Sequence, residues 1–584
     1  MKQHLECLIQ AALSQLQASG DLPETATAIH LEPTKETQFG DFACNIAMVL
    51  AKAARKKPRE IAERLVKALP ASPHVQKVEI AGPGFINFYL TPQALTDIVK
   101  TILSEKALFG SCERGQSQRV LIEFLSSNPT GPLHVGHGRH AAVGSIISNL
   151  LSTIGFNVYR EYYVNDAGRQ MDILAVSVWI RYLCLAGEAL ALPANAYQGA
   201  YVQTIAQALK DQYGAAFVVP VDQICKGLPN DESAGGEKEA YIDAIIARAK
   251  DLLGEHYEVI FTKGLTSILS DIEADLAQFG VVFDNWFSER AFVSTKVVDT
   301  LLQTLRDSGH VYEREKALWF RSTDYGDTKD RVLVRSNGQR TYFANDVAYH
   351  LRKFERGFDL AIDIFGSDHH GYVPRMKAAM QASGINTERL MHLLVQFVTL
   401  YRGQEQVAMS TRAGEFVTLR ELRQEVGNDA ARFFYVMRKF DQHIDFDLEL
   451  AKAASNENPV YYVQYAHARI ASVFRQLAER GVAYDEAKGL THLATLTQEA
   501  ERQILNTLSR YPDMILSAAL QYEPHLLTNY LRELATEFHS YYNSHQFLVE
   551  DAALRNARLS LIAAVKQVLS NGFQLLGITA PESM

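Results

Sequence analysis

The residues with the clearest chemical potential are two histidines three positions apart, His134 and His137, with Gly136 between them. They stand between a buried-strand pattern and a segment whose apolar residues repeat with helical spacing. A helix N-terminus at the carboxyl end of a parallel strand presents unpaired N–H groups and a positive dipole end, which attract phosphate. Imidazoles can donate to a phosphoryl group there, and a glycine lets a flat base approach the backbone. The pattern predicts a nucleotide site; a lone pair of this kind is also typical of surface histidines at a helix cap.

The sequence around these histidines is similar to a known signature. Residues 128–140 resemble the His-Ile-Gly-His signature of class I aminoacyl-tRNA synthetases, and residues 163–170, 283–289 and 458–469 look like the arginyl-tRNA synthetase family in particular. The resemblance covers nearly the whole chain. It implies an enzyme that activates arginine with ATP and Mg²⁺ and transfers it from arginyl-adenylate to the 3′ end of tRNA(Arg).

A second signature of this family lies at residues 408–414. Class I synthetases carry a Lys-Met-Ser-Lys-Ser loop whose lysines neutralise the triphosphate. The resemblance places Met409 and Ser410 at ATP, but Ala408 stands at the first lysine position, and Arg412, one place beyond the second, supplies the positive charge. An arginine can clamp phosphate with its planar fork. Ala408 is the one feature that favours an alternative, a paralogue that binds tRNA without aminoacylation.

An arginine substrate requires carboxylates or amide oxygens, because its guanidinium offers donors and no acceptor. Glu123 precedes Asn128 by five residues, and Tyr342 and Asp346 are four apart. The resemblance implies that Glu123 and Asn128 contact the substrate, that Asp346 binds the guanidinium and that Tyr342 packs beside it. Taken singly, Asp346 is typical of a helix N-cap and Glu123 of a buried strand residue paired with an arginine.

Asp368 follows a buried strand at residues 360–365, and we expect it to contact the ATP ribose. The family often has a glutamine that contacts the substrate in this region, and this chain has none there. His369 and His370 resemble metal ligands, but no third ligand has suitable spacing, so we expect no metal site in the protein.

These residues need a multidomain scaffold, because 584 residues exceed one domain. We expect an α/β fold: a small α+β N-terminal domain at 1–112 and a Rossmann-like parallel-sheet catalytic domain at 117–385 with a helical insertion near 175–265. A signature-loop and connecting region at 386–455 follows, and then an all-α helical bundle at 456–584. The resemblance implies that the first unit binds tRNA and that the bundle binds the anticodon.

The composition is that of a globular protein, with 47% hydrophobic and 21% charged residues. No apolar run of spanning length and no secretory signal is legible, and the five cysteines are unpaired in spacing, so we expect a cytoplasmic protein with no membrane contact. We also expect a monomer.

The formal net charge is −9, so a nucleic acid must be met by local patches. Residues 52–67 carry seven basic and two acidic side chains, among them Lys56 and Lys57, which we expect to contact tRNA unless this is only a solvated helix face. Tyr461 and Tyr465 offer stacking faces for unpaired bases, or belong to the core.

Neither step of the implied reaction needs a protein nucleophile, so we expect catalysis from positioning and charge stabilisation by His134, His137 and Arg412. A nucleotidyltransferase that adenylates a carboxylic acid without tRNA is a second enzymatic interpretation, but it leaves the two additional domains unexplained.

Overall fold

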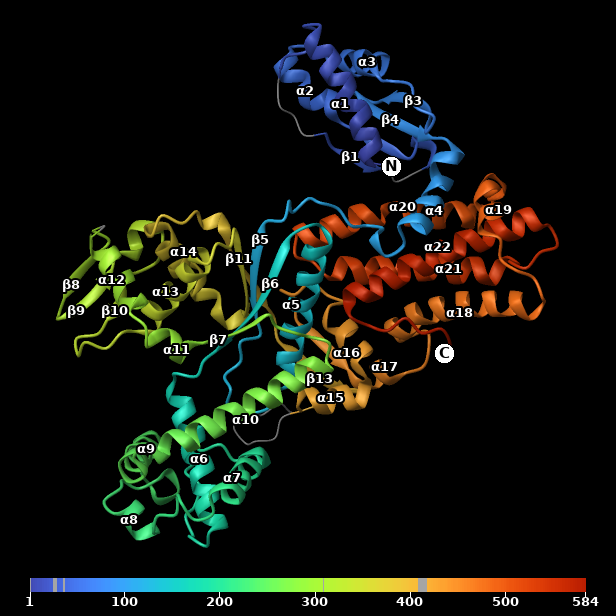
Figure 1. The fold of residues 1–584 in the computed structure, drawn as a ribbon. Coiled ribbons are helices and arrows are strands. Elements are labelled where there is room, and N and C mark those ends of the chain that lie inside the picture. The colour runs from blue at the N-terminus through green and yellow to red at the C-terminus, as the bar shows by residue number, and fades with distance from the viewer. Residues whose placement is uncertain (1, 25–28, 35–36, 308, 408–416) are drawn as a thin grey trace.

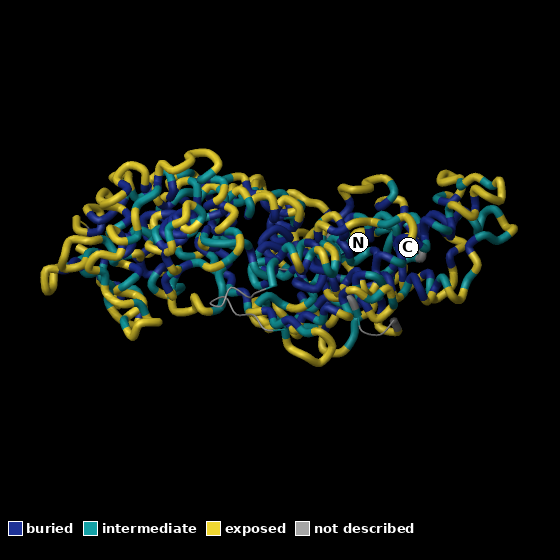
Figure 2. The backbone as a smooth tube through the Cα atoms, turned by 90° about the horizontal axis from the view of Figure 1, so that it is seen from below, coloured by how far each residue is buried: buried dark blue, intermediate teal, exposed yellow. Residues whose placement is uncertain are grey.

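The computed structural model describes residues 2–24, 29–34, 37–307, 309–407 and 417–584. Figure 1 shows a central parallel sheet, an N-terminal unit above it, a helical insertion below it and the C-terminal helices to one side. The molecule is elongated, and each of these parts contains buried residues (Figure 2). The expected α/β fold with an α+β N-terminal unit and an all-α C-terminal bundle is confirmed.

The N-terminal unit packs three helices on a four-stranded antiparallel sheet with order β1-β2-β4-β3 and has its own hydrophobic core. Its elements are α1 (Lys2–Ala18), β1 (Leu31–Pro33), η1 (Thr37–Phe39), β2 (Phe42–Cys44), α2 (Ile46–Ala54), α3 (Pro58–Ala68), β3 (Val75–Ala81) and β4 (Phe85–Leu90). The short strands β1 and β2 have no clear alternation in the sequence; β1 pairs with β2, and β2 pairs with β4.

The central sheet has five parallel strands in the order β12-β11-β5-β6-β7. They are β5 (Arg119–Phe124), β6 (Asn157–Val164), β7 (Asn285–Ser288), β11 (Leu360–Gly366) and β12 (Leu390–Val395). α5 (Val135–Thr153) connects β5 to β6 and packs so tightly that a Cβ at Gly144 would lie 2.2 Å from the Phe124 ring. The strand order reverses between β5 and β11, which is where ligands bind in sheets of this kind.

Two insertions lie between strands of this sheet. The first, between β6 and β7, is helical as expected and contains α6 (Arg169–Leu185), α7 (Ala200–Tyr213), α8 (Val221–Cys225), η3 (Glu232–Ala234), α9 (Lys238–Leu253) and α10 (His256–Gln278). The second, between β7 and β11, contains α11 (Glu289–Val293), α12 (Val297–Asp307), β8 (Val311–Arg314), β9 (Ala317–Phe320), η4 (Ser322–Tyr325), β10 (Arg331–Val334) and α13 (Tyr342–Glu355). The predicted strands near 318–321 and 331–334 form a separate antiparallel sheet with β8.

The chain after β11 passes through η5 (Ser367–Gly371), α14 (Val373–Ala382) and η6 (Thr387–Arg389) and reaches β12. β12 pairs with β11, so the central sheet continues beyond the boundary expected at 385. A small sheet and three short helices then connect to the bundle: β13 (Val398–Arg402), β14 (Glu405–Gln406), α15 (Leu419–Val426), α16 (Asn428–Tyr435), β15 (Ile444–Asp447) and α17 (Leu448–Lys452).

The C-terminal bundle consists of α18 (Pro459–Glu479), α19 (Glu486–Thr491), η7 (Leu493–Thr495), α20 (Glu499–Leu520), α21 (His525–Ser544) and α22 (Ala552–Leu576). α4 (Pro92–Glu105) and η2 (Lys106–Leu108), which follow the N-terminal unit, pack against this bundle; Asn571 on α22 donates to the Lys106 carbonyl. Among the described residues, α22 alone is long and apolar enough to cross a membrane, in contrast to the expectation from the sequence. Its most apolar window is 67% buried, as in a core helix.

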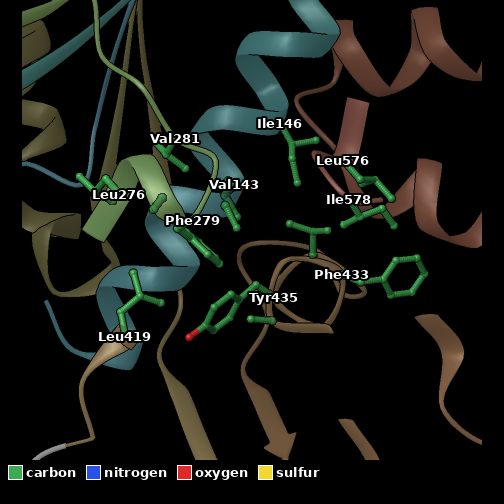
Figure 3. Close-up of a cluster of buried hydrophobic side chains, with 14 of the residues drawn as sticks. Val143, Ile146, Leu276, Phe279, Val281, Leu419, Phe433, Tyr435, Leu576 and Ile578 are labelled. Atoms are coloured by element: carbon green, nitrogen blue, oxygen red, sulfur yellow. The ribbon is translucent and has the colours of Figure 1, made fainter. Parts of the chain in front are cut away.

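A buried apolar cluster joins the catalytic sheet to the bundle. Figure 3 shows side chains of α5, α10, α15 and α16 meeting Leu576 and Ile578 from the end of the chain. The buried Arg432 guanidinium lies at this junction and donates to the carbonyls of Leu576 and Phe279 and to Ser145. The bundle is therefore rigidly attached to the helix that carries the two histidines.

Candidate active site

His134 is the N-cap of α5, and its ring stacks on that of His137 with centroids 3.5 Å apart. Nδ1 of His134 accepts from the Gly136 N–H at 3.1 Å, and Nδ1 of His137 accepts from the His134 N–H at 3.3 Å. This reciprocal capping box explains why the helix begins here. It also places Gly136 under the His134 ring, since a Cβ at Gly136 would lie 2.9 Å from His134 Cε1.

The two rings are neutral and carry their proton on Nε2. Burial lowers the pKa of His134, and burial together with His134 lowers the pKa of His137 well below its usual range. Because each Nδ1 accepts a hydrogen bond from the backbone, the remaining proton lies on Nε2. Each imidazole can therefore donate from Nε2, which is the role expected for it beside a phosphoryl group.

The expectation of unpaired N–H groups at this turn requires correction. The Val135 N–H donates to the Val417 carbonyl at 3.2 Å, and the Gly136 N–H is taken by His134. Thr418 and His134 form an isolated antiparallel bridge. The chain that leaves the second signature thus takes up the Val135 N–H in the first turn of α5, and the helix dipole can still attract phosphate.

Two acidic side chains, Glu289 and Asp346, lie close together near the carboxyl ends of β6 and β7, and we refer to their surroundings as the acidic pocket. Glu289 follows β7 directly and is 4% exposed; Asp346 lies one turn into α13 and is half-buried. Burial, and then the nearby Asp346, raise the pKa of Glu289 to about 7. Burial raises the pKa of Asp346 to about 6. Among the described residues, neither carboxyl has an ion-pair partner, so the pocket attracts a buried cation.

Polar and aromatic groups shape this pocket. Tyr163 and Asn345 hydrogen-bond Glu289, and Tyr372 hydrogen-bonds Asp346. Oδ1 of Asn345 is buried and has no partner among the described residues. A guanidinium offers five donors and no acceptor, which matches two carboxylates and a spare amide oxygen.

Glu123 lies beneath the pocket in a closed ionic network. Its Oε2 accepts from Lys353 at 2.7 Å and from Tyr349 at 3.0 Å, and its Oε1 accepts from Ser126. Lys353 also donates to Asp363 at 2.6 Å. Burial alone would lower the pKa of Lys353, yet Asp363 and Glu123 raise it above its usual value. Glu123 is thus a buried residue paired with a lysine, where the single-residue interpretation expected an arginine.

His350 joins this network through both ring nitrogens. Its Nδ1 lies 2.7 Å from the Asp346 carbonyl, and its Nε2 lies 2.9 Å from Asp363 Oδ2. Lys353 forms ion pairs with both Glu123 and Asp363, whereas Glu289 and Asp346 form no ion pair among the described residues.

The ligand atoms of His350, Asp363 and His392 lie within 4.8 Å of one another, which resembles a metal site. However, the two carboxylate oxygens of Asp363 are already engaged, one by the Lys353 ammonium at 2.6 Å and the other by His350 Nε2 at 2.9 Å. The histidines considered for a metal in the sequence, His369 and His370, are exposed on η5.

The other predicted site residues are distributed around these features. Asn128 donates to Gln170 and accepts from Asn165. Tyr342 begins α13 on the same side as Asp346, with 63% of its surface exposed. The N-cap of α13 is Thr341, so the alternative role of Asp346 as a cap is wrong. Asp368 is exposed on η5. Met409, Ser410 and Arg412 lie outside the described residues.

The predicted tRNA-contacting residues lie far from this site on the N-terminal unit and the bundle. Lys56 donates to the Asp21 carbonyl at 2.8 Å, and Lys57 is exposed at the start of α3. Tyr461 and Tyr465 are half-buried on α18 with stacked rings, and Arg469 covers Tyr465 at 4.5 Å. Their faces are thus partly available and partly packed.

Sequence reasoning did not assign roles to Glu289, Tyr163, Tyr372 or Lys353. Glu289 stands within one of the segments that carry the family resemblance, and its place directly after a strand was the available signal. Lys353 lies on one side of a helix, and nothing in the neighbouring sequence indicates that its ammonium is buried. Glu123, a partner of Lys353, and Tyr163, a partner of Glu289, are each more than 100 positions away from it in the chain.

Comparison with protein families matches the chain in three parts. Residues 3–90 match the arginyl tRNA synthetase N terminal domain; residues 98–184 and 255–468 match the class I (R) tRNA synthetase catalytic domain; residues 463–584 match the DALR anticodon binding domain. The part left between the two catalytic segments lies within the helical insertion and contains α7, α8, η3 and α9.

Curated relatives are similar over the full length. Arginine–tRNA ligases of Thioalkalivibrio sulfidiphilus and Legionella pneumophila are each 56% identical over 586 residues, with 100% of both chains covered. Among solved structures, a putative arginyl-tRNA synthetase of Campylobacter jejuni is 31% identical with a TM-score of 0.70, covering 85% of this chain and 100% of that one. The arginyl-tRNA synthetase of Thermus thermophilus shares the fold at 23% identity, with a TM-score of 0.74 over 99% of this chain and 100% of that one. The chain therefore belongs to the class I arginyl-tRNA synthetase family.

Proposed function

We propose that the histidine turn and the acidic pocket bind ATP and arginine, respectively, for the ligation of arginine to tRNA(Arg). This activity is the one carried by the full-length relatives. The observation that carries the assignment of substrates is the pair of neighbouring carboxyls, Glu289 and Asp346, which form no ion pair among the described residues and whose pKa values are raised by burial. Beyond Ala408 in the sequence, no observation favours a paralogue without aminoacylation activity.

In the first step, the arginine carboxylate attacks the α-phosphorus of ATP, and the bond to the β-phosphate oxygen breaks. The products are arginyl-adenylate and pyrophosphate. Glu289 and Asp346 hold the guanidinium, and their negative charges also select against neutral side chains. His134 and His137 donate from Nε2 to phosphoryl oxygens as charge develops on them. The closed network of Glu123 and Lys353 keeps the floor of the pocket rigid.

In the second step, a ribose hydroxyl at the 3′ end of tRNA attacks the carbonyl carbon of the adenylate. The bond to AMP breaks, and the hydroxyl proton leaves with the phosphate. The protein supplies no nucleophile, so its contribution is orientation and the exclusion of wrong substrates. We assign Asn128 and Tyr342 to the amino acid and Asp368 to the ATP ribose.

Mg²⁺ would accompany ATP on its phosphates. The described side chains at the turn are imidazoles, not carboxylates, and Mg²⁺ in such sites is held largely by substrate phosphates and water. When bound, the ion neutralises phosphate charge. Met409, Ser410 and Arg412 act on the same phosphates in this proposal, with Arg412 as the cation that compensates for Ala408.

In this proposal, the tRNA is bound by residues that lie away from the reaction centre. Lys56 and Lys57 contribute positive charge from the N-terminal unit at 1–112, and Tyr461 and Tyr465 offer ring faces on the bundle at 456–584. The catalytic unit at 117–385 and the connecting region at 386–455 lie between them. We further propose that the enzyme works as a cytoplasmic monomer, which analytical ultracentrifugation with and without tRNA tests directly.

ATP–pyrophosphate exchange tests the proposed function. We expect exchange that requires arginine, measured with and without tRNA(Arg), and transfer of labelled arginine to tRNA(Arg). Exchange with a different carboxylic acid and no tRNA would support a nucleotidyltransferase instead. Retained tRNA binding with no exchange under either condition would contradict the assignment of catalysis.

A further inference from the structure

Two tyrosines of the helical insertion converge on Thr130, four residues before His134. The Tyr201 hydroxyl donates to the Thr130 carbonyl at 2.7 Å, and the Tyr197 hydroxyl hydrogen-bonds the Thr130 side chain. Both tyrosines are half-buried, and burial raises the pKa of each. Thr130 is thus held at its main chain and at its side chain by a segment 67 to 71 positions further along the chain.

The contact is closely fitted. A Cβ at Gly131 would lie 2.9 Å from the Tyr201 hydroxyl oxygen, so a side chain at Gly131 is incompatible with the position of that hydroxyl. Tyr197 is fixed in turn, because its N–H donates to the Ser177 hydroxyl at 3.0 Å on α6. The tyrosine pair therefore belongs to the packed insertion and is not a loose surface contact.

The segment that receives these contacts leads directly to the catalytic turn. On its far side, the Leu419 N–H donates to the Leu133 carbonyl at 2.8 Å, and the Val135 N–H donates to the Val417 carbonyl. Residues 130–135 are thus held from one side by the insertion and from the other by the chain that leaves the second signature. Within this span, Pro132 contributes no backbone N–H, so the contacts at Thr130 and Leu133 determine its path.

We propose that Tyr197 and Tyr201 are positioning residues for adenylate formation. They fix Thr130, and through the short span to His134 they set where the two Nε2 donors meet the phosphates of ATP. Arginine binding depends on Glu289 and Asp346, which belong to other segments. The effect of losing the tyrosine hydroxyls therefore falls on the use of ATP and spares the binding of arginine. The inference rests on the assignment of the histidine turn to ATP.

The test uses Tyr201→Phe, Tyr197→Phe and the double variant of the full-length enzyme, which remove only hydroxyl groups. Steady-state ATP–pyrophosphate exchange gives kcat and the KM for ATP and for arginine, and thermal denaturation gives Tm. The matched control is Tyr182→Phe, since Tyr182 donates to the Gly214 carbonyl at 2.7 Å within the same insertion, away from the turn.

We expect kcat/KM for ATP to fall about fivefold in each single variant and about twentyfold in the double variant, as for the loss of one and two positioning hydrogen bonds. The KM for arginine should change by less than about twofold, and Tyr182→Phe should retain wild-type exchange. Thr130→Val, which removes the partner of Tyr197, should add nothing further to Tyr197→Phe in kcat/KM for ATP.

Wild-type exchange kinetics in the double variant would overturn the proposal. So would equal losses in the KM for arginine and for ATP, or an equal loss in Tyr182→Phe, because these results indicate a general structural effect. If the wild-type enzyme exchanges normally and the double variant does not differ from it, only the role of the tyrosines is refuted. A wild-type enzyme without exchange refutes the proposed function itself.

Discussion

The two halves of the active site are built in opposite ways. The nucleotide half is one continuous segment, in which a strand, a turn and a helix N-terminus bring His134 and His137 together within four residues. The amino-acid half is assembled from β6, α11, α13 and the chain after β11, so that Glu289 and Asp346 meet although 57 positions separate them.

The difference extends to electrostatics. The histidines are kept neutral by burial and by backbone hydrogen bonds that are local to the turn. The pKa of Glu289 is raised by burial and by Asp346, and that of Asp346 is raised by burial, which only the packed structure brings about. We therefore expect the nucleotide half, which is local, to respond to substitutions within the turn. We expect the amino-acid half, which is assembled from distant segments, to respond to changes in the network of Glu123 and Lys353.

The largest expected effect tests the foundation of the assembled half. Lys353→Met removes the ammonium that neutralises Glu123 and Asp363, and it leaves two buried carboxylates without their partner. We expect the free energy of unfolding to fall by about 3–5 kcal/mol, measured by urea denaturation. The control Lys250→Met breaks a half-exposed pair with Asp172 and should cost about 1 kcal/mol or less. Equal losses in the two variants would show that the buried network contributes no more to the free energy of unfolding than the half-exposed pair does.

The next effect concerns the guanidinium itself. Asp346→Asn and Glu289→Gln keep the shape of the pocket and remove one negative charge each. We expect kcat/KM for arginine to fall about 100-fold, since a charged hydrogen-bonded pair is lost, with the KM for ATP nearly unchanged. Glu258→Gln, on an exposed pair with Arg290, is the matched control. A parallel loss of ATP affinity would remove these carboxyls from the arginine pocket.

The dependence on pH separates the halves without a mutation. The pKa of Glu289 is raised to about 7 and that of Asp346 to about 6, so both carboxyls ionise between pH 5 and pH 8 in the free enzyme. Because the ionised forms bind the guanidinium, the KM for arginine should fall on the order of tenfold from pH 6 to pH 8. The KM for ATP should not follow this course, and Glu289→Gln should flatten the arginine profile.

The same pKa values affect stability with a definite sign. A carboxyl whose pKa is raised in the folded state binds more protons there than in the unfolded chain between its two pKa values. The free enzyme should therefore lose stability as the pH rises through about 4.5 to 7. Bound arginine offsets this loss, so it should raise Tm more at pH 8 than at pH 6. A ligand-induced shift in Tm that is independent of pH would contradict the perturbed carboxyls.

The smallest effect tests the local half. Gly136→Ala places a Cβ 2.9 Å from His134 Cε1 and forces the stacked rings to shift. We expect kcat/KM for ATP to fall about fivefold with little change in the KM for arginine. Gly264→Ala on α10 is the control, since its Cβ would make only ordinary contacts beyond 3.5 Å. Unchanged exchange kinetics in Gly136→Ala would show that the ring positions tolerate movement.

Particular residues show how far sequence reasoning reached. The strand–turn–helix around His134 and the buried strand at 360–365 were predictable, because apolar periodicity and turn residues act over a few positions. The cap of α13 was not assigned correctly, since Thr341, rather than Asp346, accepts from the Ala344 N–H. The short strands of the N-terminal sheet were missed because their pairing, and not their own sequence, creates them.

The sequence by itself determined the order of the units, the histidine turn and the membership of the family, because each depends on residue types in a contiguous run. Only the tertiary structure decided that Glu123 is paired with Lys353 while Glu289 and Asp346 form no ion pair among the described residues. The physical reason is that the charge state of a buried acid depends on which distant groups share its low-dielectric surroundings, and those distances are created by folding.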